Sequence, residues 1–138
     1  MCADRFTFQT IAELRAFETG VWFSEMPVAT ETDGLALVVR GEFGSGVSEH
    51  EYDPVPAARK RNELGTRILT SHVRFHSAPE ATAFVAGLEW FGGAFVNIEL
   101  RGVEAVVRQK RPDNENEAML DYDYEILRSL IASRNGGL

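Results

Sequence analysis

Three side chains that could bind a ligand alternate along one segment, at His72, Arg74 and His76. On a β-strand, alternate residues project from the same face, so these three would form one cationic row. With His50, which lies in a separate acidic segment, the two imidazoles could supply part of a metal site. A zinc site needs three or four ligands, however, and the sequence contains neither a Cys pair nor a helical His pair with acidic partners. We therefore predict no metal ligand and expect a solvated sheet face, with small-ligand binding as the alternative.

The densest acidic and aromatic stretch of the chain covers residues 113–125. Carboxylates near the start of a helix stabilise it through the helix dipole, so a solvated first helical turn is the plainest interpretation. Tyrosine is also enriched at protein interfaces, and acidic rims attract basic partners. On this second interpretation, the predicted partner-binding residues are Glu117, Asp121, Tyr122, Asp123, Tyr124 and Glu125.

No residue pattern in the sequence indicates a particular reaction. Gly41, Gly44 and Gly46 follow a predicted strand, but their spacing fits neither the dinucleotide-binding fingerprint nor the phosphate-binding P-loop. No serine lies in the Gly-x-Ser-x-Gly turn of hydrolases, and Cys2 is too close to a chain end to be held against a base. We therefore predict no catalytic residue and no cofactor, and an enzymatic function is the less favoured hypothesis.

The chain is acidic, with 21 Asp or Glu residues, 14 Lys or Arg residues and a net charge of −7. Binding to the nucleic-acid backbone needs clustered Lys and Arg, and the only dense basic runs are short, at 59–61 and 108–111. We therefore expect no direct nucleic-acid binding. The lone cysteine, Cys2, excludes an intramolecular disulfide, and the sequence shows neither a signal peptide nor an apolar run of membrane-spanning length. A cytoplasmic protein without membrane contact is the expectation.

Two segments of the chain, residues 8–17 and 75–84, share an outline of residue types. Each contains a capping box, in which a Thr or Ser oxygen accepts from a backbone N–H three residues on and a Glu reaches back to the N–H of the cap residue. Thr10 and Ser77 are therefore predicted to begin two helices. The shared outline favours two repeated halves, although any two capped helices with an aromatic anchor share some of these positions.

Hydrophobic periodicity and turn residues predict the remaining elements. The first two helices are expected to end at Gly20 and Gly92, and a third is expected from a weak Asn114 capping box to about Arg134. Residues 44–65 form the longest predicted loop, with a short helix at 57–64 as an alternative. Strands are predicted at 5–8, 21–26, 35–43, 67–75, 95–100 and 103–108.

A length of 138 residues fits one domain that spans residues 1–138. The predicted fold is α+β, with an antiparallel or mixed sheet and helices packed mainly on one face. The strands could form one sheet or two small ones, although a single sheet is the simplest layer arrangement. The predicted element order is β-α-β-β-(long loop)-β-α-β-β-α, which divides into two βαββ halves and a final helix.

These observations predict a non-enzymatic intracellular protein-binding module, such as an inhibitor, an immunity-type protein or a regulatory protein. Its acidic and tyrosine-rich surface would contact a basic partner, including one that normally binds nucleic acid, because rows of carboxylates imitate phosphates in charge. One alternative is a small-ligand-binding protein or unusual enzyme that uses His50 with the row of His72, Arg74 and His76, with the 44–65 loop as a lid. Another is a self-associating structural subunit, with a sheet edge or an exposed tryptophan as the contact.

Overall fold

The computed structural model describes residues 2–23, 28–41, 46–52, 68–91, 95–110 and 116–136. Within these ranges the chain forms eight strands and three helices. The α+β class that the sequence predicts is therefore confirmed. In chain order the elements are β1 (Cys2–Thr7), α1 (Ile11–Phe23), β2 (Val28–Asp33), β3 (Ala36–Gly41), β4 (Gly46–Glu51), β5 (Ile68–Arg74), α2 (Ala78–Phe91), β6 (Phe95–Arg101), β7 (Glu104–Lys110), β8 (Ala118–Asp123) and α3 (Tyr124–Gly136).

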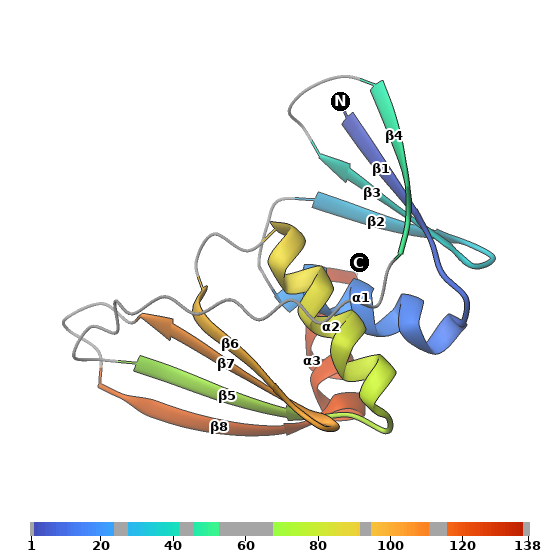
Figure 1. Ribbon diagram of the computed structural model, residues 1–138. Coiled ribbons are helices and arrows are strands. Elements are labelled where there is room, and N and C mark those ends of the chain that lie inside the picture. The colour runs from blue at the N-terminus through green and yellow to red at the C-terminus, as the bar shows by residue number, and fades with distance from the viewer. Residues whose placement is uncertain are drawn as a thin grey trace.

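The strands form two four-stranded mixed sheets, whereas a single sheet would be the simplest arrangement. Sheet A has the order β2-β3-β1-β4, and sheet B has the order β6-β7-β5-β8. In sheet A, β1 is antiparallel to β3 and parallel to β4; in sheet B, β5 is antiparallel to β7 and parallel to β8. The helices lie between the two sheets, so each sheet has an inner face toward the helices and an outer face (Figure 1).

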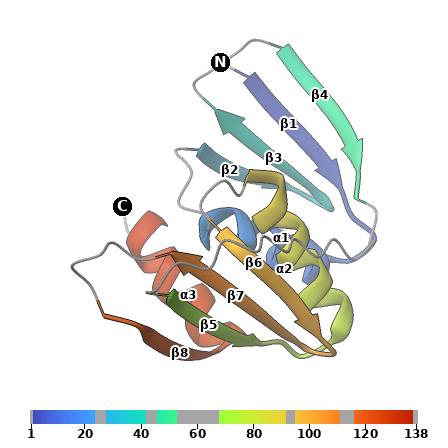
Figure 2. The same ribbon diagram turned by 60° about the vertical axis from the view of Figure 1, so that its left-hand side comes forward.

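Each half of the chain is a β-α-β-β-β unit with the same sheet order and the same strand directions. The hairpin turns correspond as well. The N–H of Phe8 donates to the carbonyl of Leu35 at 2.9 Å, and the N–H of Phe75 donates to the carbonyl of Val103 at 2.8 Å. Figure 2 shows the two sheets on either side of the α1–α2 pair. The predicted pseudo-repeat is thus confirmed, with one strand more in each half than expected.

Both predicted capping boxes begin helices, α1 and α2. The N–H of Glu13 donates to Oγ1 of Thr10 at 3.2 Å, and the N–H of Glu80 donates to Oγ of Ser77 at 3.4 Å. In each box the hydroxyl also donates to the Glu carboxylate, at 2.9 and 3.0 Å. In both boxes the Glu carboxylate therefore accepts from the cap hydroxyl. In a usual capping box it accepts from the backbone N–H of the cap residue instead.

Gly20 does not end α1, which continues to Phe23. The predicted strand at 21–26 is therefore wrong for residues 21–23, while residues 24–27 lie outside the described ranges. The hairpin partner of β3 is instead β2. A Cβ on Gly20 would lie 2.2 Å from the carbonyl oxygen of Phe84 in α2. Close approach of two backbones requires a residue without a side chain, so this glycine is a packing residue and not a stop signal.

Two further strands lie where the sequence analysis predicted other structure. β4 occupies part of the predicted long loop, and residues 53–67, which include the alternative helix at 57–64, lie outside the described ranges. β8 occupies the start of the predicted third helix, so α3 begins at Tyr124; the Asn114 box also lies outside the described ranges. The alternation of apolar and acidic residues from Leu120 to Asp123 fits the two-residue period of a strand, which the helical interpretation overlooked.

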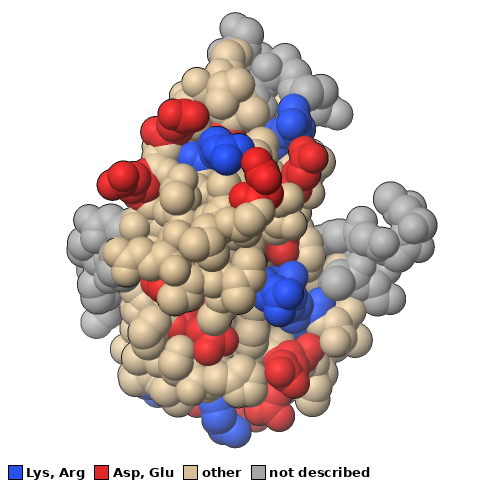
Figure 3. Space-filling model, turned by 90° about the vertical axis from the view of Figure 1, so that its right-hand side faces the viewer, with Lys and Arg blue, Asp and Glu red and all other residues tan. Residues whose placement is uncertain are grey.

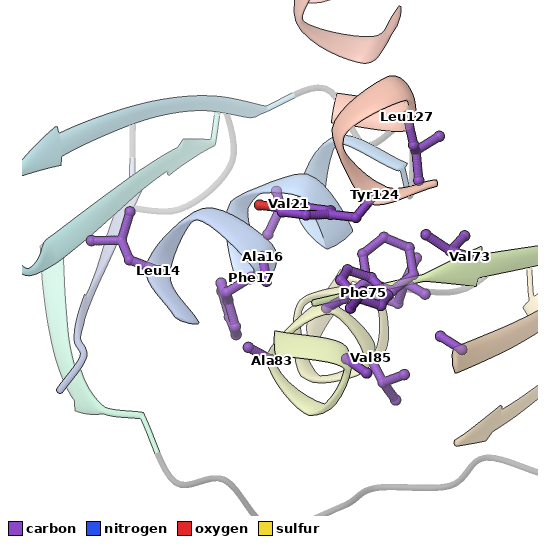
Figure 4. Close-up of a cluster of buried hydrophobic side chains, with 14 of the residues drawn as sticks. Leu14, Ala16, Phe17, Val21, Val73, Phe75, Ala83, Val85, Tyr124 and Leu127 are labelled. Carbon is purple, nitrogen blue, oxygen red and sulfur yellow. The ribbon is translucent and has the colours of Figure 1, made fainter. Parts of the chain in front are cut away.

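One hydrophobic cluster draws residues from both halves and from α3. In Figure 4, side chains of α1, α2, β5 and α3 converge between the two sheets. An equivalent aromatic pair lies in each half: Phe8 with Tyr52 and Phe75 with Tyr124, each with ring centroids 4.9 Å apart. In both halves, therefore, the residue that follows the edge strand anchors that strand to the core.

Candidate functional site

Strands β5 and β8 are adjacent and parallel, which brings the two predicted sets of site residues together. His72 lies opposite Asp121, and Arg74 lies opposite Asp123. A guanidinium nitrogen of Arg74 is 4.0 Å from a carboxylate oxygen of Asp123. Because Val73, between them, is buried in the core, His72 and Arg74 project from the outer face of sheet B. The cationic row and the carboxylates of β8 therefore lie on the same face of sheet B, which we call the mixed-charge surface.

A shallow hollow of about 130 Å³ lies on this mixed-charge surface. At the hollow, Nδ1 of His72 is 3.0 Å from a carboxylate oxygen of Glu104, on the neighbouring strand β7. Glu104 is a site residue that the sequence analysis missed, because only the pairing of β7 with β5 places it there. The hollow is lined by His72, Arg74, Glu104, Asp121, Tyr122 and Asp123.

His76 and Glu125 continue the surface beyond the ends of β5 and β8. Nε2 of His76 is 3.3 Å from a carboxylate oxygen of Glu125, which lies in the first turn of α3. The His76 ring also lies edge-on to Tyr124, with ring centroids 6.3 Å apart. Glu117 is exposed directly before β8. Every predicted site residue except His50 is therefore found on or beside the strand pair β5–β8.

His50 does not join the other two histidines, because it lies on β4 in sheet A. Its Nε2 is 3.0 Å from a carboxylate oxygen of Asp4. Its ring stacks on Phe6 and meets Trp90 edge-on, with centroid distances of 5.0 and 4.8 Å. The structure thus separates His50 from the row of His72, Arg74 and His76. Residues 44–45 and 53–65 of the predicted lid lie outside the described ranges.

The two tyrosines of the acidic stretch differ in exposure. Tyr124 is only 7% exposed, and burial of its phenol raises the pKa of that group. Tyr122 is partly buried and packs against the core from the inner face of sheet B. Tyr124 is therefore a core residue. The exposed members of the predicted partner-binding set are the residues that carry carboxylates.

The mixed-charge surface is acidic overall, because five carboxylates face one guanidinium and two imidazoles. The pairs Arg74–Asp123 and His76–Glu125 join side chains that are all more than half exposed. Exposed pairs of this kind typically contribute only about 0–1 kcal/mol, so the carboxylates stay available to other cations. On the face of the molecule in Figure 3, acidic and basic side chains are likewise interspersed. The five carboxylates belong to Glu104, Glu117, Asp121, Asp123 and Glu125.

The edge strands β4 and β8 share a pattern that the sequence analysis did not identify. Residues 49–52 read Glu-His-Glu-Tyr, and residues 121–124 read Asp-Tyr-Asp-Tyr. Both segments run parallel to the first strand of their half in the same register. Glu49 and Glu51 are therefore the structural counterparts of Asp121 and Asp123.

The inner face of sheet B holds a second hollow, of about 310 Å³, between the sheet and α3. Most of its lining is apolar and includes Leu69 of β5, Leu120 of β8 and Leu130 of α3. Leu120 is 38% exposed and Leu130 is 57% exposed, so the rim of this groove is apolar and open. The sequence analysis missed the groove because it assigned residue 120 to a helix.

Within the described ranges, no group of three or more His, Cys, Asp or Glu side chains is arranged to hold a metal ion. The helices of the described part include none that is long and apolar enough to cross a membrane. Comparisons with protein-family models, with curated proteins and with solved structures found no match to this chain.

Proposed function

We propose that the chain is a non-enzymatic protein-binding module that contacts a basic partner through the outer face of β8 and the first turn of α3. The observation that supports this most directly is the exposure of Asp121, Asp123 and Glu125 along β8 and the first turn of α3, with Met119, which is 69% exposed, on the same face of β8 as the two aspartates. An exposed apolar residue in line with exposed carboxylates has the composition of a contact surface for a basic protein.

The ion pairs within this surface do not oppose such a contact. Arg74 and His76 hold Asp123 and Glu125 in exposed pairs, which a Lys or Arg of the partner can replace at little cost. The surplus of carboxylates would speed association with a basic partner, and this effect weakens as salt concentration rises. An inhibitor, an immunity-type protein or a regulatory protein would act in this way by covering a basic surface, including that of a nucleic-acid-binding protein.

The test compares a triple variant, Asp121→Asn with Asp123→Asn and Glu125→Gln, with the control variant Glu49→Gln with Glu51→Gln. The control removes the equivalent carboxylates from β4, the corresponding edge strand of sheet A. Proteins retained by the immobilised wild-type chain are identified, purified and titrated against all three forms at several salt concentrations.

We expect the triple variant to bind about tenfold more weakly or worse, to lose most of the salt dependence and to keep its melting temperature. The control variant should bind like the wild type. Equal affinity of the triple variant and the wild type for the purified partner would refute the proposal, as would the absence of any protein that binds after purification.

The hollow of about 130 Å³ supports a second candidate function, the binding of a small ligand that carries both charges. It offers the guanidinium of Arg74 and the imidazole of His72 beside three carboxylates, which suits a small zwitterion. Amino acids and phosphorylated compounds can be screened by thermal shift, because a ligand that binds only the folded state stabilises it. The shift should vanish in Arg74→Gln and persist in Arg40→Gln. No shift across the panel would remove this candidate.

A further inference from the structure

β8 is an edge strand, and in the described part of the chain it pairs with β5 alone. Such a strand presents backbone N–H and C=O groups that can pair with another strand. Side chains alternate along it, with Asp121 and Asp123 on the outer face and Leu120 and Tyr122 on the inner face. A segment placed along this edge would therefore meet carboxylates on one side and apolar side chains on the other.

The apolar side leads into the groove of about 310 Å³ beneath α3. Leu120 and Tyr122 bound it from β8, and Leu127 and Leu130 bound it from α3. Because Leu120 and Leu130 are partly exposed, an apolar side chain that entered the groove would remove both from water. The groove thus offers a site for apolar side chains on the inner side of the same edge.

We propose that the partner contributes an extended segment of alternating basic and apolar residues, which adds to sheet B alongside β8. Its backbone pairs with the edge, its basic side chains face Asp121 and Asp123, and its apolar side chains enter the groove. Opposite charges on neighbouring strands stabilise their pairing, which sets the register of the added segment. This inference rests on the proposed function and narrows the partner to a stated sequence pattern.

A second copy of this chain fits the β8 edge poorly. Pairing of β8 with another β8 would place the carboxylates of Asp121 and Asp123 near those of the other copy, and like charges on neighbouring strands are destabilising. Charged side chains on edge strands commonly prevent such self-pairing. The same two carboxylates therefore disfavour a homo-oligomer through this edge and favour a basic strand.

The edge strand β4, which is the counterpart of β8 in sheet A, provides an internal comparison. It carries Glu49 and Glu51 on its outer face, but its inner residue His50 is held by Asp4 at 3.0 Å. An apolar side chain that entered there would have to displace a polar pair, which is unfavourable. β8, and not β4, is therefore the expected docking edge.

The probes are two synthetic peptides of equal composition, one with strictly alternating Lys and Val and one with the lysines and valines in separate blocks. Binding is measured by fluorescence anisotropy at fixed salt, and NMR maps the contact. We expect the wild-type chain to bind the alternating peptide about tenfold more tightly than the blocked peptide. The double variant Asp121→Asn with Asp123→Asn should bind the alternating peptide about tenfold more weakly than the wild type does. N-methylation of its edge-facing amides should abolish binding.

Leu130→Asn should weaken binding of the alternating peptide several-fold. Ile126→Asn should leave this binding unchanged, because Ile126 is about equally exposed on α3 but does not line the groove. If Leu130→Asn disturbs folding, Leu120→Thr alters the groove from its β8 side instead and should weaken peptide binding in the same way. Equal binding of the two peptides, or NMR shifts confined to β4, would overturn the inference. If the natural partner needs the three carboxylates but tolerates Leu130→Asn, the proposed function stands and this inference fails.

Discussion

Gly20 of α1 and Gly87 of α2 make the same contact, each with the backbone of the opposite helix. A Cβ on Gly20 would lie 2.2 Å from the carbonyl oxygen of Phe84, and a Cβ on Gly87 would lie 2.3 Å from the carbonyl oxygen of Phe17. Each glycine follows by one helical turn the phenylalanine that the other glycine contacts. The two halves of the chain therefore meet through a locally two-fold symmetric backbone contact.

Replacing either glycine with alanine should destabilise the protein. The added Cβ must push the opposite helix away, since backbone atoms cannot rotate aside, and overpacking typically costs about 1–3 kcal/mol. The gain in helix propensity, about 1 kcal/mol, offsets only part of that loss. Urea unfolding should give a net loss of about 1–2 kcal/mol for Gly20→Ala and for Gly87→Ala, because both clashes are with backbone atoms.

The double variant with both alanines should lose less than the sum of the single losses, because one displacement of the helices relieves both clashes. Ser129→Ala, at an exposed position of α3, is the control and should change stability by about 0.5 kcal/mol at most. An increase in stability for Gly20→Ala would show that the helix contact is looser than described.

Arg128 joins α3 to α1, and its removal should be costly. Its guanidinium donates to a carboxylate oxygen of Glu18 at 2.9 Å, to the carbonyl of Arg15 at 2.9 Å and to Oγ1 of Thr19 at 3.0 Å. The Glu18 side chain is only 6% exposed, so Arg128→Met would leave a buried carboxylate without its cation. We expect a loss of about 3 kcal/mol in the free energy of unfolding.

Adding Glu18→Met to Arg128→Met should recover part of that loss, because the buried charge disappears with its partner. Arg40→Met breaks the exposed pair with Glu31 and should cost about 0–1 kcal/mol. Similar losses for Arg128→Met and Arg40→Met would contradict the buried character of the Arg128–Glu18 pair. Hydrogen exchange of α3 amides would report detachment of the helix separately from global unfolding.

The two capping boxes should differ in their contribution to stability. Loss of a cap hydroxyl typically costs about 1 kcal/mol, and Thr10→Ala, at an exposed box, should follow that value. Ser77→Ala should cost more, because Glu80 is buried and would lose the hydroxyl that donates to its carboxylate. Thermal or urea unfolding of the two variants measures the difference; equal losses would mean that burial of Glu80 is unimportant.

Tyr124 should make the protein less stable at alkaline pH. Burial raises the pKa of its phenol above the usual 10.0, so the folded state favours the neutral form. This contribution is complete below pH 10.0 and is lost as pH rises through the raised pKa of the folded state. Tyr124→Phe should therefore flatten the fall in the free energy of unfolding above that pH, whereas Tyr122→Phe serves as the control. An unchanged slope in Tyr124→Phe would contradict this assignment.

Local interactions made part of the fold predictable from the sequence. The boxes at Thr10 and Ser77 begin helices because their hydrogen bonds join residues three apart, which any context permits. Alternation likewise indicated β6, since the two-residue period is visible within one strand, and hydrophobic segments bounded by turn residues indicated β5 and β7. The same rule, applied to residues 120–123, would have identified β8, and comparison of residues 49–52 with 121–124 would have identified both β4 and β8.

The candidate site depended on sheet pairing, which no short segment contains. In the sequence, His72 and Asp121 belonged to two separate predicted sites. In the structure they are neighbours only because β8 pairs in parallel with β5. Tyr124 looked like an interface residue beside its acidic neighbours, but it is buried in the core, where its ring contacts that of Phe75. The sequence by itself determined the α+β class, the two helix starts and the acidic stretch, because these follow from local hydrogen bonds, periodicity and charge. Tertiary structure alone decided that Gly20 lies at a helix crossing and that the basic and acidic residues share one surface, because both depend on contacts between distant segments.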